Sequence, residues 1–173
     1  MPIYALGDIE PAIDPTAFVH PDAVVIGDVR IGPEASIWPG AVLRGDGGGT
    51  IVIGAQTSIQ DNAVIHTVPG CPTVVGSRCL IGHLVHLEGC TIREGALVGN
   101  AAMVLHRSVV GEGASVAANS VVLYDVDIPA LALAAGSPAV IKEGRSDPEM
   151  IQVGVESYLE RVRSYPTLLR RVG

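Results

Sequence analysis

The chain has 173 residues, the size of one ordinary domain; 48% of them are hydrophobic but 3% are aromatic, and Val, Ile and Leu make up 52. This composition, with 21 glycines, excludes a disordered chain and a leucine- and lysine-rich helix bundle, and it favours many short strands around a core of small branched side chains. The formal net charge of −7 argues against nucleic acid and anionic membranes as partners.

The start of the chain, Met1 to Glu10, has neither a basic region nor a long apolar run, so it shows no secretory signal. No uncharged apolar stretch reaches the roughly 18 residues that a membrane-spanning helix needs. Cys71, Cys79 and Cys90 are odd in number and lack a CxxC spacing. We therefore expect a cytoplasmic protein with three reduced thiols.

An apolar residue recurs at every sixth position along most of the chain, apart from two four-residue insertions and one five-residue step. The positions are Ile13, Val19, Val25, Ile31, Ile37, Leu43, Ile53, Ile59, Ile65, Val75, Ile81, Leu87, Ile92, Val98, Val104, Val110, Val116, Val122, Ile128, Ala134 and Val140. All except Ala134 are Ile, Val or Leu, and small or β-branched residues such as Ala23, Ala35 and Ala96 follow four positions later. Such regularity is not expected by chance.

A period of six suits neither an α-helix nor a long strand, but it suits a short strand followed by a corner. Three such units close a triangular coil, and successive coils stack about 4.8 Å apart. The pattern therefore predicts an all-β solenoid, a parallel β-helix of hexapeptide repeats, over residues 1–145. The inward Ile and Val side chains would fill a prism that is too narrow for aromatic rings.

A helix is predicted in the remaining segment, residues 146–173. Asp147, Pro148 and Glu149 are typical of a helix start, with proline in the first turn and acid near its positive end. One apolar stripe then follows the helical period, at Ile151, Val155, Tyr158, Leu159 and Val162. We expect this helix to pack along a prism, either its own or that of a neighbouring chain.

Polar residues interrupt the repeat in two columns. Arg44, His66 and Glu88 each follow an inward residue and are separated by three repeat units, so they should lie above one another in successive coils. Asp61 and His83, with Gln60 beside Asp61, form a second column on the next face. The columns should be about 15–20 Å apart in one chain, too far to share a metal ion, whereas prisms packed with threefold symmetry could bring them together. For His20, His86 and His106 taken singly, a solvated surface position is the simpler interpretation.

These residues resemble a known family. Arg44-Gly45-Asp46, Gln60-Asp61, Ile65-His66-Thr67 and Ile81-Gly82-His83 are similar to motifs of the γ-class carbonic anhydrases, and the similarity covers essentially the whole chain. The resemblance implies a left-handed coil, which the sequence pattern alone does not give. It also implies a homotrimer with a metal ion between subunits, formed from two ligands of one chain and a third of its neighbour.

The resemblance implies His66, His83 and the position of Glu88 as the metal ligands. The family usually has histidine at this third position, so Glu88 is a departure. Two histidines and a carboxylate suit Zn²⁺, with Fe²⁺ or Co²⁺ as alternatives. His86, two residues before Glu88, could replace it as a ligand, relay protons, or have no role.

The implied activity is the reversible hydration of CO₂ to bicarbonate by metal-bound hydroxide. Gln60 and Asp61 would position the reactants, and Arg44 and Asp46 would form an ion pair across subunits. An anionic Glu88 and the absence of an acid from the loop of residues 67–72 predict weak activity. The alternatives are a hexapeptide acyltransferase that uses acyl-CoA, although the two insertions are short and contain no histidine, and a non-catalytic metal-binding or scaffold relative.

Overall fold

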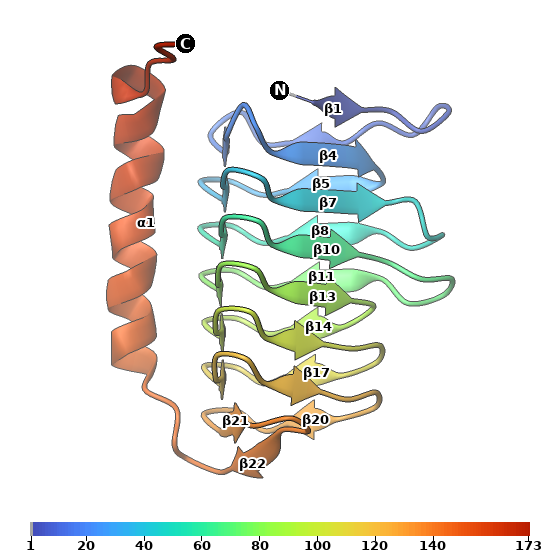
Figure 1. Ribbon diagram of the computed structural model, residues 1–173, viewed down its shortest axis with the longest axis vertical. Helices are drawn as coiled ribbons and strands as arrows, with labels where there is room; N and C mark the ends of the chain where they lie inside the picture. Colours follow the sequence, from blue (N-terminus) through green and yellow to red (C-terminus); the bar gives the residue numbers. More distant parts are fainter. Residues whose placement is uncertain (1) are drawn as a thin grey trace.

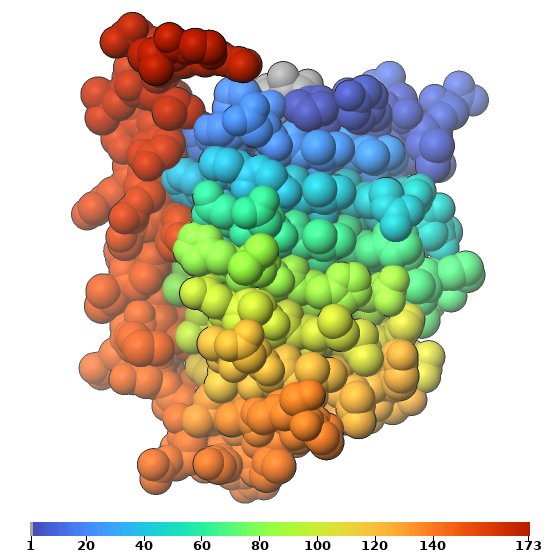
Figure 2. Space-filling model, in the orientation of Figure 1, coloured from blue at the N-terminus to red at the C-terminus, as the bar shows by residue number. Residues whose placement is uncertain are grey.

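The computed structural model describes residues 2–173 and shows a left-handed parallel β-helix with one long helix beside it (Figure 1). Three sheets form the three sides of a prism. All strands but the last are parallel and each successive one belongs to the next sheet, whereas the last strand returns antiparallel beside the one before it. Stacked coils of this kind confirm the fold that the six-residue period predicts. The space-filling view shows the coils as successive bands alongside the helix (Figure 2).

Each sheet takes every third strand in chain order, and the third sheet also takes the last strand. The first sheet comprises β1 (Ile3–Tyr4), β4 (Val24–Gly27), β7 (Val42–Gly45), β10 (Val64–His66), β13 (His86–Glu88), β16 (Met103–Val104) and β19 (Val121–Val122). The second comprises β2 (Ala12–Ile13), β5 (Val29–Ile31), β8 (Ile51–Ile53), β11 (Thr73–Val75), β14 (Thr91–Ile92), β17 (Val109–Val110) and β20 (Asp127–Ile128). The third comprises β3 (Phe18–Val19), β6 (Ser36–Ile37), β9 (Ser58–Ile59), β12 (Leu80–Ile81), β15 (Leu97–Val98), β18 (Ser115–Val116), β21 (Leu133–Ala135) and β22 (Val140–Lys142).

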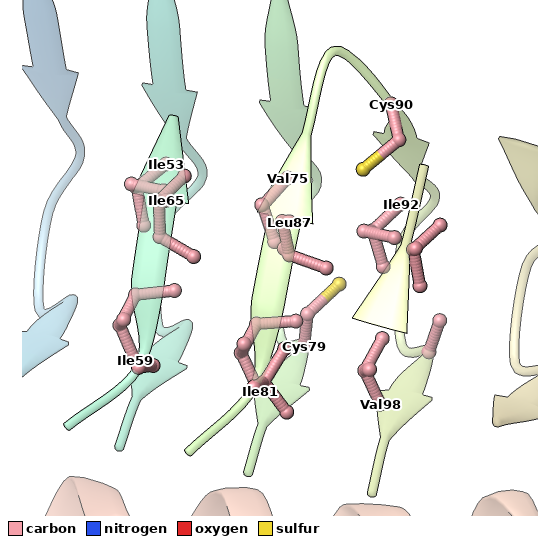
Figure 3. Packing of buried hydrophobic residues seen from close by; sticks show 14 of the residues in the cluster. Ile53, Ile59, Ile65, Val75, Cys79, Ile81, Leu87, Cys90, Ile92 and Val98 are labelled. Carbon is pink, nitrogen blue, oxygen red and sulfur yellow. The ribbon is translucent and has the colours of Figure 1, made fainter. Parts of the chain in front are cut away.

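The core is the column of inward side chains predicted from the repeat. From Val19 to Ala134 every predicted inward residue is buried, and the small residues at the corners, such as Ala41 and Ala96, are buried between them. Figure 3 shows several of these residues stacked inside the prism. Cys79 and Cys90 lie in this core, and burial raises the pKa of each thiol to about 12. All three cysteines are free.

The last predicted inward position is wrong. Val140 is 62% exposed, because β22 runs antiparallel to β21 and pairs Val140 with the outward-facing Ala135. In the same pairing Ile141 lies opposite the inward Ala134 and packs against the core. Chain reversal after the last coil therefore shifts the inward position by one residue.

The helix α1 (Pro148–Leu168) runs back along the prism, so that both chain ends lie at the same end of the molecule (Figure 1). The Asp147 carboxylate caps it by accepting a hydrogen bond from the Met150 backbone N–H. Its buried stripe consists of Ile151, Val155, Leu159 and Val162, as the sequence predicts, and it packs against the third sheet of its own prism. No helix within residues 2–173 is both long and apolar enough to cross a membrane.

The aromatic side chains lie outside the prism. Trp38 and Phe18 face outward from the first coils of the third sheet and pack against Tyr158 and Tyr165 of α1, with ring centroids between 5.2 and 5.8 Å apart. The Trp38 indole N–H is 3.0 Å from the hydroxyls of both Ser36 and Ser58. The prism thus excludes aromatic rings, and four of the six attach the helix to it.

Candidate functional site

The first polar column is present. Strand pairing places His66 of β10 directly between Arg44 of β7 and Glu88 of β13, as the repeat arithmetic predicts. All three side chains lie where their strands end and the chain turns toward the second sheet. Parallel pairing with a constant register is what brings residues 22 positions apart into contact.

Contacts connect this column into one chain of charged groups. The Arg44 guanidinium donates to Asp46 at 2.6 Å, and the other carboxylate oxygen of Asp46 is 3.0 Å from His66 Nε2. His66 Nδ1 is in turn 2.9 Å from Oε1 of Glu88. Both ring nitrogens of His66 therefore face a carboxylate.

The electrostatics of the column favour ionised acids. The His66 hydrogen bond, followed by nearby histidine charge, holds the pKa of Glu88 below its ordinary value although burial opposes this. Burial would raise the pKa of Asp46, but hydrogen bonds from Arg44 and His66 outweigh it and lower that pKa. Both carboxylates are therefore charged at neutral pH and can act as ligands or hydrogen-bond acceptors.

Two further histidines surround Glu88. Nε2 of His106 lies 3.3 Å from Glu88 Oε2, and Nε2 of His86 lies 4.0 Å from the same oxygen. Burial lowers the pKa of His86. The sequence pattern favours a solvated surface position for His106, whereas the structure places it against Glu88. Simple counting misses this contact, because the pairing offset between the two coils changes from 17 residues, at Leu87 and Val104, to 18, at Ile92 and Val110.

The second column lies at the corner between the third and first sheets. His83 Nδ1 is 2.8 Å from Asp61 Oδ2, and the His83 backbone N–H donates to the Asn100 side chain at 3.1 Å. Gln60 is buried, with 7% of its surface exposed. The α1 residue Tyr158 is close enough for the Asp61 charge to contribute, after burial, to raising the pKa of its hydroxyl.

The two columns occupy opposite edges of the first sheet. Five residues separate Asp61 from His66, which corresponds to about 16 Å of extended chain. Within residues 2–173 no three His, Cys, Asp or Glu side chains gather in an arrangement that could hold a metal ion. One chain therefore brings His66 and Glu88 together but does not bring His83 to them.

The residues present nevertheless fit a zinc ion that takes a further ligand from elsewhere. Imidazole nitrogen and carboxylate oxygen are ordinary zinc donors, and two donors of a tetrahedral zinc lie about 3.3 Å apart. The 2.9 Å separation of His66 Nδ1 and Glu88 Oε1 is within a few tenths of an ångström of that value. A contact between His66 Nε2 and a carboxylate is also typical of metal-binding histidines.

Comparisons with known proteins show which families are similar to this chain. A sequence model described as bacterial transferase hexapeptide (six repeats) matches residues 12–45. Gamma carbonic anhydrase 2, mitochondrial, from Arabidopsis thaliana is 40% identical over 152 residues, which cover 84% of this chain and 54% of the plant protein. The chain thus spans about half the length of that relative.

Two further proteins are similar over more of their own length. The carnitine operon protein CaiE of Escherichia coli strain K12 is 40% identical over 150 residues, covering 87% of this chain and 76% of CaiE. The crystal structure of a hexapeptide transferase family protein from Anaplasma phagocytophilum superposes with a TM-score of 0.90 at 37% identity, covering 95% of this chain and 98% of that one. The chain therefore belongs to the γ-class carbonic anhydrase family of hexapeptide-repeat, left-handed β-helix proteins.

Proposed function

We propose that the protein is a metal-dependent carbonic anhydrase of the γ class, active as a homotrimer on CO₂ and bicarbonate. His66 and Glu88 of one subunit and His83 of the partner subunit would hold the metal, with Zn²⁺ favoured and Fe²⁺ or Co²⁺ as alternatives. The plant gamma carbonic anhydrase named above supports this proposal through its sequence similarity.

The position of His66 between two carboxylates carries the proposal. A neutral imidazole has one N–H, so it can donate to Asp46 or to Glu88 but not to both. When Nε2–H donates to Asp46, the bare Nδ1 faces the Glu88 carboxylate, and two lone-pair groups meet at 2.9 Å. A second proton or a cation relieves this repulsion, and a divalent metal ion supplies more positive charge there than a proton does.

An exposed apolar stripe supports the trimer. On the outer face of the first sheet, strand register aligns Val42, Val64, His86, Met103 and Val121 one above another. Val64 and Met103 are each 38% exposed, and α1 does not cover this face because it packs on the third sheet. The stripe lies between the two polar columns. A second chain packed on it would approach both of them.

Each polar residue has a role suited to its position. When bound, zinc supplies a Lewis acid that lowers the pKa of water and so provides a nucleophile for CO₂. The buried Gln60 can both donate and accept hydrogen bonds and would orient CO₂ or the nucleophile, while Asp61 holds the ring of His83. Arg44 fixes Asp46, which in turn fixes His66. An Arg44–Asp46 pair at a subunit boundary would also serve assembly.

The test is metal analysis of the purified trimer together with stopped-flow CO₂ hydration. We expect about one metal ion per subunit in the wild type and loss of most metal in His66→Ala and Glu88→Ala, with His20→Ala as a histidine control outside the columns. Wild-type protein that binds no metal stoichiometrically, at any supplied metal, would reject the proposal.

An acyltransferase is the second candidate, favoured by the similarity to the Anaplasma protein, which is described as a member of a hexapeptide transferase family. The two insertions form stacked loops, and the Gly47 backbone N–H in one lies 3.3 Å from the Thr67 hydroxyl in the other. Neither loop carries a histidine. A thermal shift with acetyl-CoA, followed by acetyl transfer, would favour this function over CO₂ hydration.

A non-catalytic scaffold is the third outcome. Such a protein would keep the trimer and the metal but would not hydrate CO₂ at any pH. The two experiments above separate it from both enzymes, because it gives a positive metal analysis and a negative result in each activity assay.

A further inference from the structure

Both oxygens of the Glu88 carboxylate are in contact with histidine. Oε1 is 2.9 Å from Nδ1 of His66, and Oε2 is 3.3 Å from Nε2 of His106. The side chains of Glu88 and His106 are each 21% exposed, so solvent reaches both only partly. Nε2 of His86 lies 4.0 Å from Oε2, so His106 makes the shorter of the two ion-pair contacts with that oxygen.

The ring of His106 is itself supported. It lies against the ring of Tyr124 in the next coil, with the centroids 5.0 Å apart and the planes inclined by 36°. On its other side Nε2 of His106 faces Oε2 of Glu88 in the preceding coil. His106 is therefore held between an aromatic ring and a carboxylate.

We infer that His106 is a positioning residue for Glu88, a role that rests on the proposed function of Glu88 as a metal ligand. Its Nε2 lies 3.3 Å from Oε2, where an N–H would restrain that oxygen and leave Oε1 alone to face His66 and the metal. A carboxylate without such a partner can rotate, withdraw, or bind a metal through both oxygens. A hydrogen-bonded carboxylate binds in one orientation, and loss of a partner of this kind typically costs about 10–100-fold in metal affinity.

Two substitutions separate positioning from packing. His106→Phe keeps a ring against Tyr124 but cannot donate a hydrogen bond, whereas His106→Gln loses the ring but keeps an N–H that can reach Oε2. A positioning role predicts that H106F is defective and H106Q is close to wild type. A packing role predicts the reverse order.

The experiment measures Co²⁺ binding to the full-length protein, by competition with a chelator, together with the visible spectrum of the bound Co²⁺. We expect the apparent Kd of H106F to rise about 10–100-fold and its absorption bands to change in intensity as Glu88 gains freedom to bind through both oxygens. H106Q should keep the wild-type spectrum and bind within a few-fold of wild type. His20→Gln, in a histidine remote from the columns, is the matched control.

Unchanged affinity and spectrum in H106F, or a larger defect in H106Q than in H106F, would overturn the positioning role while leaving the proposed function in place. Failure of the wild type to bind Co²⁺ would overturn both. If H106F does not fold, H106A provides the same comparison with H106Q.

Discussion

Glu88 sets the net charge of the proposed metal site. Three imidazoles surround it, and its carboxylate adds a negative charge where a neutral ligand would leave the full charge of a divalent cation. A metal with an anionic ligand is a weaker Lewis acid, so water beside it ionises at a higher pH. In the proposed site the same carboxylate would also strengthen metal binding. Higher affinity for the metal would therefore come with a less acidic water.

Glu88→His therefore tests the proposed role of Glu88 as the third metal ligand. We expect the variant to hydrate CO₂ about fivefold faster at pH 7, because a fall in the pKa of the nucleophile from about 8 to about 7 raises its ionised fraction from about one tenth to about one half. Stopped-flow pH-rate profiles of both proteins, normalised to bound metal, measure the effect. An unchanged or higher midpoint in E88H would contradict this account of Glu88.

At this scale the sequence predicts the columns but not all of their contacts. Arg44, His66 and Glu88 could be aligned by counting, because parallel pairing fixes which residues share a column. The approach of His106 to Glu88 could not be predicted in the same way, because the pairing offset changes from 17 to 18 residues at the corner that holds His106. Which of these groups hold a metal remains a proposal.

At the scale of elements, α1 is fastened to the prism by charge as well as by its apolar stripe. Glu34, Gln56 and Arg78 stack on successive coils at one corner and are joined by hydrogen bonds. The helix contacts both ends of this row, through Arg163 to Glu34 at 3.1 Å and through Glu156 to Arg78 at 2.7 Å. These pairs lie on partly exposed surface and fix the placement of the helix more than its stability.

The Glu34 contact predicts a pH dependence. Hydrogen bonds from Gln56 and then Arg163 lower the pKa of Glu34. A folded-state pKa below the ordinary value gives stability that is present above the unfolded pKa, near 4.3, and is lost as pH falls through the lower folded value. Wild type should therefore have a higher Tm than Glu34→Gln at pH 6, and the difference should shrink as the pH falls below about 4. A difference that is constant down to pH 3 would contradict this, and Glu149→Gln, at an acidic residue of α1 outside the row, is the control.

The helix also shows where element-level prediction stops. Its start and buried stripe follow from the sequence, because capping and the helical period are local. Local patterns could not decide whether it covers its own prism or that of a neighbour. In the structure the helix packs on its own prism. Aromatic packing holds it there, between Trp38 and Phe18 on the first coils and Tyr158 and Tyr165 on the helix.

At the scale of the whole molecule, the packed core moves function to the surface. The interior of the prism is filled by branched side chains and two thiols. Functional residues on this fold must therefore lie on its outer surface, and the two polar columns lie at the two edges of the first sheet. The apolar stripe between them is the surface through which assembly and activity would be coupled.

Val64→Lys tests that coupling. A lysine in the stripe would have to be buried at a subunit interface, which is costly for an unpaired charge, so the variant should be monomeric and should lose its metal as well. Light scattering after gel filtration and metal analysis measure both effects. Val153→Lys, at a position on α1 that is 70% exposed, is the matched control and should leave both unchanged. A V64K trimer with full metal content would contradict the assignment of this face.

The parallel stacking of the coils has a consequence for how the site could change. Every coil adds one inter-strand step of about 4.8 Å, so distances along a column are whole multiples of that step. Insertion of a complete coil between β13 and β16 would separate His106 from Glu88 and leave His66 beside Glu88. Insertion between β10 and β13 would separate His66 from Glu88 instead. The site is thus modular, and its parts can be detached one at a time by changing the number of coils without altering a residue of the site.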